Sequence, residues 1–334
     1  MSCPCWFPLA GYLQRFFTDR LLGELGASPH TVASYRDTFR LLLKFASKHY
    51  RRPASDLKME DLDAKFISTF LNHLERDRHN RARTRNSRLC AIHALFGYVS
   101  DNEPALAGHC QRVLSIPLKR FERGPVEFLT LEETAALLNA PDVTTWLGRR
   151  DQLLLHLAIQ TGLRNSELTG LRRQDLHLGA GAHIRCLGKG RKTRCTPVRA
   201  DLAARLSAWI NQQPPEPTTP VFPTANGKAM SADALQRLVG RHIKAAAKGC
   251  PSLRKKRVTP HTLRHTLAMS LLQSGVDITV IALWLGHESI ETTQIYLHAD
   301  MAMKEKALAR VTHAKTQLKR YHPADQLLAF LESL

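Results

Sequence analysis

The sequence predicts a mainly α-helical protein of two domains, the second of which includes a small antiparallel β-sheet. Three observations lead to this fold class: a length of 334 residues, apolar residues that recur at helical spacing along most of the chain, and two short β-like runs joined through the turn GKGRK. At roughly 100 to 200 residues per domain, the chain is long enough for two hydrophobic cores. We therefore expect an all-helical N-terminal domain and an α-rich second domain.

The first domain, residues 1–115, is expected to be a helical bundle. Ser28 followed by Pro29 is typical of a helix start, because the serine can cap the helix and the proline lacks an N–H that the first turn leaves unpaired anyway. Apolar side chains then recur every three or four residues in three successive helices. They are Val32, Tyr35, Phe39, Leu42 and Ala46; Leu62, Phe66, Phe70 and Leu74; and Leu89, Ile92, Phe96 and Val99.

A segment rich in Pro, Gly and charged residues predicts a linker over residues 116–126, and the second domain then spans residues 127–334. Thr130 and Glu133 form a capping box at its start, and a long apolar helix ends at Gly162. Strands are expected over residues 183–187 and 193–198. Helices resume near residues 201, 231, 260, 278 and 289.

The C-terminal segment carries an apolar stripe on a short final helix after Pro323. Its members are Leu327, Leu328, Leu331 and Leu334. Such a stripe must be covered, either by the helix's own domain or by a neighbouring protomer, and the sequence leaves both alternatives open.

The composition is basic and globular at once, with a net charge of +19, a pI near 10.0 and 43% hydrophobic residues. This balance argues against disorder and favours a polyanionic partner, with nucleic acid ahead of an anionic membrane. The sequence lacks the ~18 consecutive apolar residues of a membrane span, and its start does not resemble a signal peptide, so we expect a cytoplasmic protein. The seven scattered cysteines are expected to be reduced thiols, and no metal site is expected.

The positive charge is shared between the domains. Residues 1–120 hold 19 Lys and Arg against 11 Asp and Glu, a net charge of +8, which leaves +11 for the remainder. We therefore expect both domains to close on the polyanion as a C-shaped clamp. Six arginines within residues 76–88 suit a phosphate contact at a helix entrance, although a charge run is also compatible with a solvated surface. The residues expected to contact DNA are Arg81, Arg83, Arg85, Arg88, Arg191, Lys192, Arg194, Arg254, Lys255, Lys256 and Arg257.

Four separated motifs carry the candidate chemistry, and each has an ordinary structural interpretation when taken alone. They are TGLRNSEL with Arg164 and Glu167; GKGRKTR with Lys189; TPHTLRHTLA with His261, Arg264 and His265; and LGHESIETTQIYLH with His287 and Tyr296. The third motif places its His, Arg and His at i, i+3 and i+4, on one helix face near a helix N-terminus, where an anion is favoured. Tyr296 by itself would be a core aromatic.

Together these motifs resemble the tyrosine recombinase family, which includes phage integrases, Xer-type chromosome-resolution enzymes and transposon recombinases. The family order is Arg, Lys, His-x-x-Arg, His or Trp, and Tyr. In this chain the order is filled by Arg164, Lys189, His261, Arg264, His287 and Tyr296. The resemblance covers residues from about 127 to 300, and the Arg-rich first domain looks like the family's core-binding domain.

The chemistry explains these residue types. Attack on a phosphodiester builds negative charge on the non-bridging oxygens, which Arg164 and Arg264 are suited to stabilise without Mg²⁺, with His287 as a further donor. Tyr296 is the expected nucleophile, and its unperturbed pKa of ~10 calls for a base, for which His261 is the candidate. Lys189 is the candidate acid for the 5′ oxygen. Glu167 and His265 are expected beside these groups, where Glu167 orients Arg164 or its loop.

The resemblance implies a site-specific recombinase of the integrase or transposon type that forms a 3′-phosphotyrosyl intermediate and a Holliday junction, with no cofactor, metal or ATP. It also implies a homo- or hetero-tetramer on double-stranded DNA sites, joined through the C-terminal helix, in a bacterial-type protein that associates with the nucleoid. The alternatives are type IB topoisomerase-like relaxation and a sequence-specific DNA-binding protein that does not cut. Integration or transposition is favoured over chromosome resolution.

Overall fold

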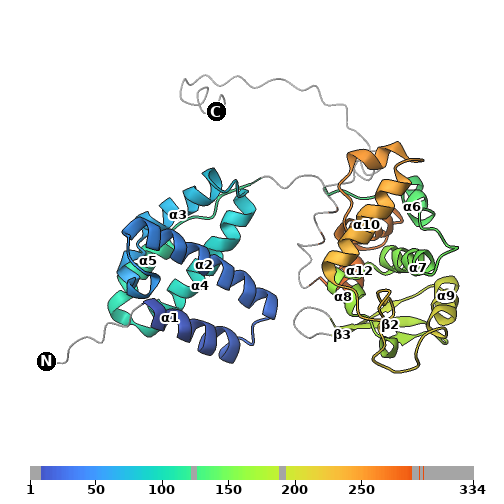
Figure 1. Ribbon diagram of the computed structural model, residues 1–334, viewed down its shortest axis with the longest axis horizontal. Helices are drawn as coiled ribbons and strands as arrows, with labels where there is room; N and C mark the ends of the chain where they lie inside the picture. The colour runs from blue at the N-terminus through green and yellow to red at the C-terminus, as the bar shows by residue number, and fades with distance from the viewer. Residues whose placement is uncertain (1–8, 122–125, 188–192, 288–292, 294–295, 297–334) are drawn as a thin grey trace, which may run out of the picture. The chain divides into compact units, whose positions relative to one another are not determined.

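The computed structural model describes residues 9–121, 126–187, 193–287, 293 and 296. The chain divides into two compact units, Met1–Arg123 and Gly124–Leu334 (Figure 1). The described residues are mainly helical and include one three-stranded antiparallel sheet, which confirms the mainly α-helical fold with a small sheet. The assignment of DNA binding to residues 1–115 and of catalysis to residues 127–334 stays a prediction.

The first unit is a bundle of helices. Its longer elements are α1 (Leu9–Arg15), which continues as the π-helix η1 (Phe16–Glu24), then α2 (Pro29–Tyr50), α3 (Ala64–Arg76), α4 (Ala82–Asn102) and α5 (Ala107–Leu114). Short 3₁₀ turns lie at Ala54–Asp56, Met59–Asp61 and Pro104–Leu106. The predicted start of α2 is confirmed, because the Ser28 side chain accepts a hydrogen bond from the Thr31 N–H at 3.2 Å.

The second unit combines helices with the sheet. Its helices are α6 (Leu131–Leu138), α7 (Trp146–Thr161), α8 (Asn165–Gly170), α9 (Ala200–Ile210), α10 (Ala232–Ala246), α11 (Pro260–Gln273) and α12 (Ile278–Leu285), with 3₁₀ turns η5 (Arg173–Asp175) and η7 (Pro251–Lys255). The strands are β1 (Leu176–His177), β2 (His183–Leu187) and β3 (Thr193–Pro197). They pair in the order β1-β2-β3, and Cys186 lies opposite Arg194.

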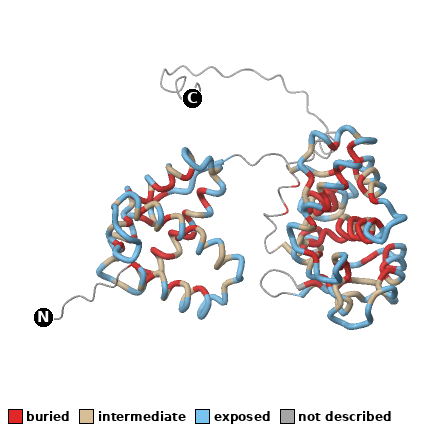
Figure 2. Tube along the Cα trace, in the orientation of Figure 1, coloured by how far each residue is buried: buried red, intermediate tan, exposed pale blue. Residues whose placement is uncertain are grey.

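Each unit has its own core, visible as the buried segments in Figure 2. In the second unit α7 packs against α11, and α11 packs against α12. The predicted capping box at α6 is confirmed: the Thr130 N–H donates to Glu133 at 2.9 Å, and the Glu133 N–H donates to the Thr130 hydroxyl at 3.2 Å. This packing brings the end of α7, the start of α11 and the end of α12 together.

No helix among the described residues combines the length and apolar character needed to cross a membrane. In the same part of the chain, no group of three or more His, Cys, Asp and Glu side chains is arranged to hold a metal ion. Lys189, Arg191, Lys192, Cys3, Cys5 and the expected final helix after Pro323 lie outside the described residues.

Candidate active site

The candidate site forms where α7 and α12 end. Gly162 and Gly286 close these helices in the left-handed conformation, with φ of 62° and 63°. A Cβ on Gly162 would lie 2.8 Å from Leu285 Cδ2 and 2.9 Å from Leu267 Cδ2, so a side chain here would collide with α11 and α12. Glycine therefore permits both the turn and the close approach of the three helices.

Arg264 lies at the centre of this junction and is only 2% exposed. Its Nη1 donates to the Gly162 carbonyl oxygen at 2.7 Å, and its Nη2 donates to the Leu285 carbonyl oxygen at 2.5 Å. Burial, with the nearby charges of Arg164 and Arg194, lowers the pKa of Arg264 to about 10. The guanidinium therefore stays charged at neutral pH and is fixed in place by the ends of α7 and α12.

Arg164, at the start of α8, lies beside the same junction. Its Nη2 donates to the Gly286 carbonyl oxygen at 2.5 Å, and its Nη1 donates to Glu167 at 3.0 Å. Its side chain is 29% exposed, in contrast to that of Arg264. Arg164 and Arg264 are thus held on consecutive carbonyl groups, those of Gly286 and Leu285, and Arg164 is the one open to solvent.

Glu167 is buried beneath Arg164. One carboxylate oxygen accepts the backbone N–H of Arg164 at 2.7 Å, and Arg194 donates to both oxygens, at 2.7 and 2.8 Å. Burial alone would raise the pKa of Glu167, but the hydrogen bonds from Arg194 and from the Arg164 backbone outweigh it and lower the pKa. Glu167 is therefore an anion that fixes both the side chain and the backbone of Arg164.

Tyr296 is 1% exposed and packs in the core formed by α11 and α12. Its hydroxyl lies 2.8 Å from Nδ1 of His265, and its ring is stacked on the ring of His287 at a centroid distance of 6.4 Å. Burial raises the pKa of Tyr296 to about 12, although Arg264 opposes the shift. The tyrosine is therefore protonated and shielded from solvent.

His265 and His287 are held neutral. Burial and the neighbouring cationic groups lower the pKa of His265 and of His287 to about 4. His287 Nδ1 lies 2.7 Å from the Thr293 hydroxyl. A neutral His265 can accept the hydrogen bond that the Tyr296 hydroxyl donates.

The predicted residues converge only in part. Arg164, Arg264, His287 and Tyr296 lie around one junction, and the His261 ring contacts the His265 ring at a centroid distance of 4.3 Å. His261 itself is exposed, and the hydroxyl of Tyr296 is bonded to His265 rather than to His261, the expected base. The i, i+4 spacing of His261 and His265 is the sequence signal that the two histidines lie side by side on α11.

The arginine-rich entrance of α4 contains both exposed and buried side chains. Arg81 and Arg83 are exposed, as a DNA contact requires. Arg85 points inward instead: it is 6% exposed, and its Nη1 donates to Asn86 at 3.2 Å and to the Pro117 carbonyl oxygen at 3.3 Å. Arg88 is half-buried, and burial lowers its pKa. The position of Arg85 thus opposes its expected contact with DNA, because its buried guanidinium forms hydrogen bonds within the first unit.

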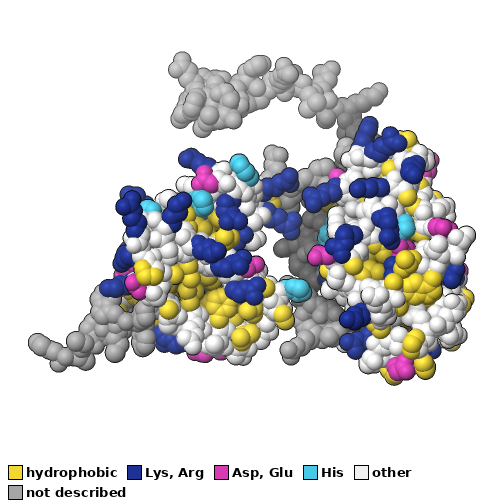
Figure 3. All heavy atoms as spheres, in the orientation of Figure 1, with side chains coloured by type: hydrophobic (Ala, Val, Ile, Leu, Met, Phe, Trp, Pro, Cys, Tyr) yellow, Lys and Arg dark blue, Asp and Glu magenta, His cyan; other side chains and the backbone are white. Residues whose placement is uncertain are grey.

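The basic segment before α11 divides in the same way. Arg254, Lys255 and Arg257 are exposed. The ammonium group of Lys256 donates to the Phe128 carbonyl oxygen at 2.8 Å and to the buried Glu133 at 2.6 Å. Lys256 therefore anchors this segment to the start of α6, which opposes its expected role as a DNA contact. Basic side chains also spread over the visible face of each unit in Figure 3.

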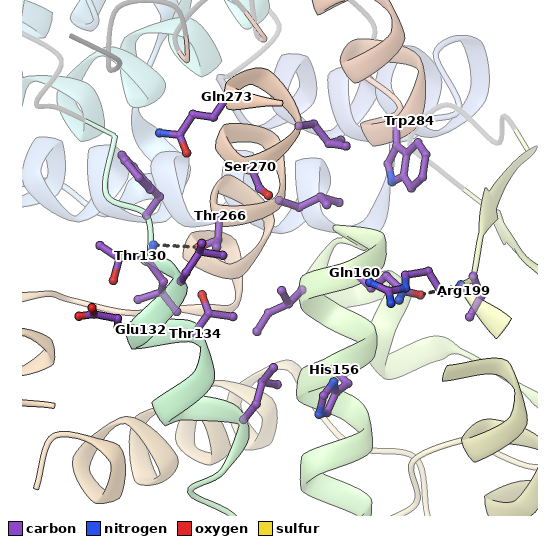
Figure 4. Close-up of a pocket in the computed structure, with 18 of the residues that line it drawn as sticks. Thr130, Glu132, Thr134, His156, Gln160, Arg199, Thr266, Ser270, Gln273 and Trp284 are labelled. Atoms are coloured by element: carbon purple, nitrogen blue, oxygen red, sulfur yellow. Dashed lines mark hydrogen bonds between the residues drawn. The ribbon is translucent and has the colours of Figure 1, made fainter. Parts of the chain in front are cut away.

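A separate cavity of about 1080 Å³ lies between α6, α7 and α11 (Figure 4). Its wall is mostly apolar, with Leu131 at 86% exposure and with Trp284, whose buried Nε1 has no hydrogen-bond partner among the residues that the structure describes. Figure 4 labels Thr266 and Ser270 on α11 and His156 and Gln160 on α7 among the lining residues, and Gln160 accepts a hydrogen bond from the Arg199 backbone N–H at 2.9 Å. The cavity lies beside the core that holds Tyr296, because Leu267 belongs to both.

Two family models match the chain. The phage integrase family model matches residues 127–303, and the model of the phage integrase N-terminal SAM-like domain matches residues 13–102. An integrase/recombinase of Sinorhizobium fredii is 52% identical over 326 residues, which covers 98% of both chains. The tyrosine recombinase XerC of Rhodospirillum centenum is 35% identical over 283 residues, covering 83% of this chain and 80% of that protein.

Solved structures share the fold. The XerH site-specific recombinase bound to a palindromic difH substrate, in a post-cleavage complex, has a TM-score of 0.66 at 24% identity, covering 85% of this chain and 81% of that chain. The Tn1549 transposon integrase in complex with a circular intermediate DNA has a TM-score of 0.66 at 17% identity, covering 89% and 98%. At 24% and 17% identity, these similarities show a shared fold and nothing further.

Proposed function

The chain belongs to the phage integrase family of tyrosine recombinases and is a site-specific recombinase, and we propose that it cleaves and rejoins double-stranded DNA through a covalent bond between Tyr296 and a 3′ phosphate. The observation that carries this assignment is the convergence of Arg164, Arg264, His287 and Tyr296 on the junction of α7, α11 and α12.

The two arginines are proposed to bind the scissile phosphate. In each arginine, Nη1 and Nη2 each donate one hydrogen bond within the protein. The remaining N–H groups of the guanidinium are left to donate to phosphate oxygens. Their fixed positive charges would stabilise the extra negative charge that develops on the non-bridging oxygens, with His287 as a further donor. The required charge is thus supplied by protein side chains, without a metal ion or ATP.

The proposed reaction exchanges one phosphodiester for another. The phenolic oxygen of Tyr296 forms a bond to phosphorus while the bond from phosphorus to the 5′ oxygen breaks. The phenolic proton passes to His261, the candidate base, and the 5′ oxygen receives a proton from Lys189, which lies outside the described residues. Attack by a 5′ hydroxyl of a partner strand reverses the step, so that strand exchange through a Holliday junction needs no energy source.

Tyr296 must change its position for this reaction. Its hydroxyl is bonded to His265 inside the core, where a DNA phosphate cannot approach it. We propose that the tyrosine leaves His265 before it attacks. After that movement His261, exposed one turn before His265, is the base candidate nearest to solvent.

Assembly is proposed to use the C-terminal segment. Its leucine stripe, residues 327–334, matches in character the apolar cavity between α6, α7 and α11, and we propose a tetramer on DNA in which the segment of one copy enters the cavity of the next. Deletion of residues 324–334 should abolish the tetramer in mass photometry with DNA and retain single-site binding. If the deletion lowers the melting temperature of the free protein and leaves assembly intact, the segment covers its own domain.

A protein with this substrate is proposed to work in the cytoplasm, on the nucleoid.

A nicked suicide substrate tests the reaction. The wild-type protein should form a covalent protein–DNA adduct in EDTA, and Tyr296→Phe should form none. An adduct with the phenylalanine variant would overturn the assignment of the nucleophile. Exchange of flanks between two labelled DNA sites separates recombination from topoisomerase-like relaxation, and absence of any adduct would support a DNA-binding protein that does not cut.

A further inference from the structure

Arg194 occupies a position that no catalytic assignment uses. It lies on β3, on the inward side of the sheet, and its side chain is 13% exposed. Both of its terminal nitrogens donate to Glu167. A Cβ on Gly286 would lie 3.0 Å from Arg194 Cδ and Nη1, so this guanidinium is packed against the turn that ends α12. It was expected to contact DNA, and the structure places it in a buried ion pair instead.

Arg194 and Arg164 share one carboxylate. Glu167 is 5% exposed and receives hydrogen bonds from both guanidinium groups. A single buried Glu167–Arg164 pair would be neutral, and Glu167 would then compete with a phosphate for the charge of Arg164. With Arg194 present, two positive charges surround one negative charge, and the cluster keeps a net positive charge.

We propose that Arg194 is a positioning residue of the recombinase, which neutralises Glu167 and thereby leaves the charge of Arg164 available to the scissile phosphate. The proposal rests on the phosphate-binding role of Arg164. The two arginines make different contacts in this cluster. Arg194 donates to both oxygens of Glu167, while the Arg164 side chain donates to one oxygen through Nη1 and to the Gly286 carbonyl oxygen through Nη2. A residue that merely packed the sheet would have no reason to respond to the charge of Glu167.

The first experiment is a charge-rescue cycle with the nicked suicide substrate under single-turnover conditions. Arg194→Ala should slow adduct formation by about 100-fold, the size expected for the loss of one charge-stabilising group. Arg194→Lys should recover most of that loss. The double variant Arg194→Ala/Glu167→Gln should be at least about tenfold faster than Arg194→Ala, because it removes the unbalanced carboxylate. A double variant no faster than Arg194→Ala would overturn the proposal.

The second experiment uses a DNA substrate with a methylphosphonate at the scissile position, which removes the charge of one non-bridging oxygen. The deficit of Arg194→Ala relative to wild type should shrink by about tenfold or more on this substrate, since less negative charge must be stabilised. An equal deficit on both substrates would assign Arg194 a purely structural role. Arg185→Ala, an exposed arginine on the adjacent strand β2, is the matched control and should stay within about threefold of wild type.

The outcomes separate the proposal from the function on which it rests. If the wild-type protein forms no adduct, the proposed reaction fails. If the wild type reacts and Arg194→Ala reacts at the same rate, only the role of Arg194 fails. Should Arg194→Ala not fold, the comparison of Glu167→Gln with Arg194→Ala/Glu167→Gln still decides: similar rates support the charge-balancing role, and a loss of about 100-fold in the double variant contradicts it.

Discussion

The hydroxyl of Tyr296 lies 2.8 Å from Nδ1 of His265, within the core of the second unit. The contact pairs a protonated phenol, whose pKa burial raises to about 12, with a neutral imidazole, whose pKa burial lowers to about 4. The proposed nucleophile is thus held in an unreactive form, and it must leave this contact to attack DNA.

The reactivity of Tyr296 in the free protein should depend on His265. His265→Ala removes the acceptor and opens space beside the ring, so nitration of Tyr296 by tetranitromethane should become at least about tenfold faster than in the wild type, since solvent access governs the rate. Peptide mapping by mass spectrometry gives the rate, with Tyr35 of the first unit as the internal reference. An unchanged ratio of the two tyrosines would show that His265 does not retain Tyr296.

Folding stability should fall between pH 6.5 and pH 4. The folded protein holds His265 and His287 at a pKa of about 4, below the ordinary value of 6.5, so the unfolded chain binds protons that the folded chain rejects in this window. The stabilising contribution is complete above pH 6.5 and is lost as the pH falls. Urea unfolding at pH 7 and pH 5 measures the loss, which should be smaller in His265→Gln/His287→Gln. An equal loss in this variant would refute the contribution of the two histidines.

Arg83 and Arg85 should behave differently although they are two residues apart on α4. Arg83 is exposed, so Arg83→Ala should weaken DNA binding and reduce the slope of log affinity against log salt by about 1. Arg85 is buried, so Arg85→Ala should lower the free energy of unfolding by about 1 to 3 kcal/mol, through its lost hydrogen bonds, and leave the slope unchanged. Fluorescence anisotropy and urea titration distinguish them, and a reversed pattern would contradict the orientation of α4.

Lys256 and Lys255 provide a second contrast. Lys256→Met leaves the buried carboxylate of Glu133 without its cation, at a cost of about 3 kcal/mol in the free energy of unfolding. Lys255 is exposed, and Lys255→Ala should leave stability within about 0.5 kcal/mol of wild type. Thermal and urea unfolding measure both. Equal stabilities of the two variants would show that the Lys256–Glu133 pair does not anchor the segment before α11.

The sequence predicts the helical architecture and the order of the candidate residues because both depend on periodic patterns and spacing. The direction of a single charged side chain is harder to obtain, since a run of arginines identifies a basic segment without its inner face. Extending the apolar stripe of Leu89, Ile92 and Phe96 back by one turn leads to position 85, which would have placed Arg85 inward.

Arg194 and Lys256 show a different limit. Strand alternation places Arg194 on the same side as the buried Thr196, which is a usable signal, but its partner Glu167 comes from a distant segment. Lys256 and Glu133 are likewise far apart in the sequence and meet only in the folded chain. Long-range ion pairs of this kind require the packing of α6, α8 and β3, which no local pattern specifies.

The most direct test of the central claim is to identify the amino acid that becomes linked to DNA. The wild-type protein is trapped on a nicked suicide substrate, digested with trypsin and nuclease, and analysed by tandem mass spectrometry. The proposed chemistry requires a peptide whose Tyr296 carries a 3′-phosphate-linked nucleotide remnant. A linkage at any other residue, or a 5′-phosphate linkage at Tyr296, would contradict it.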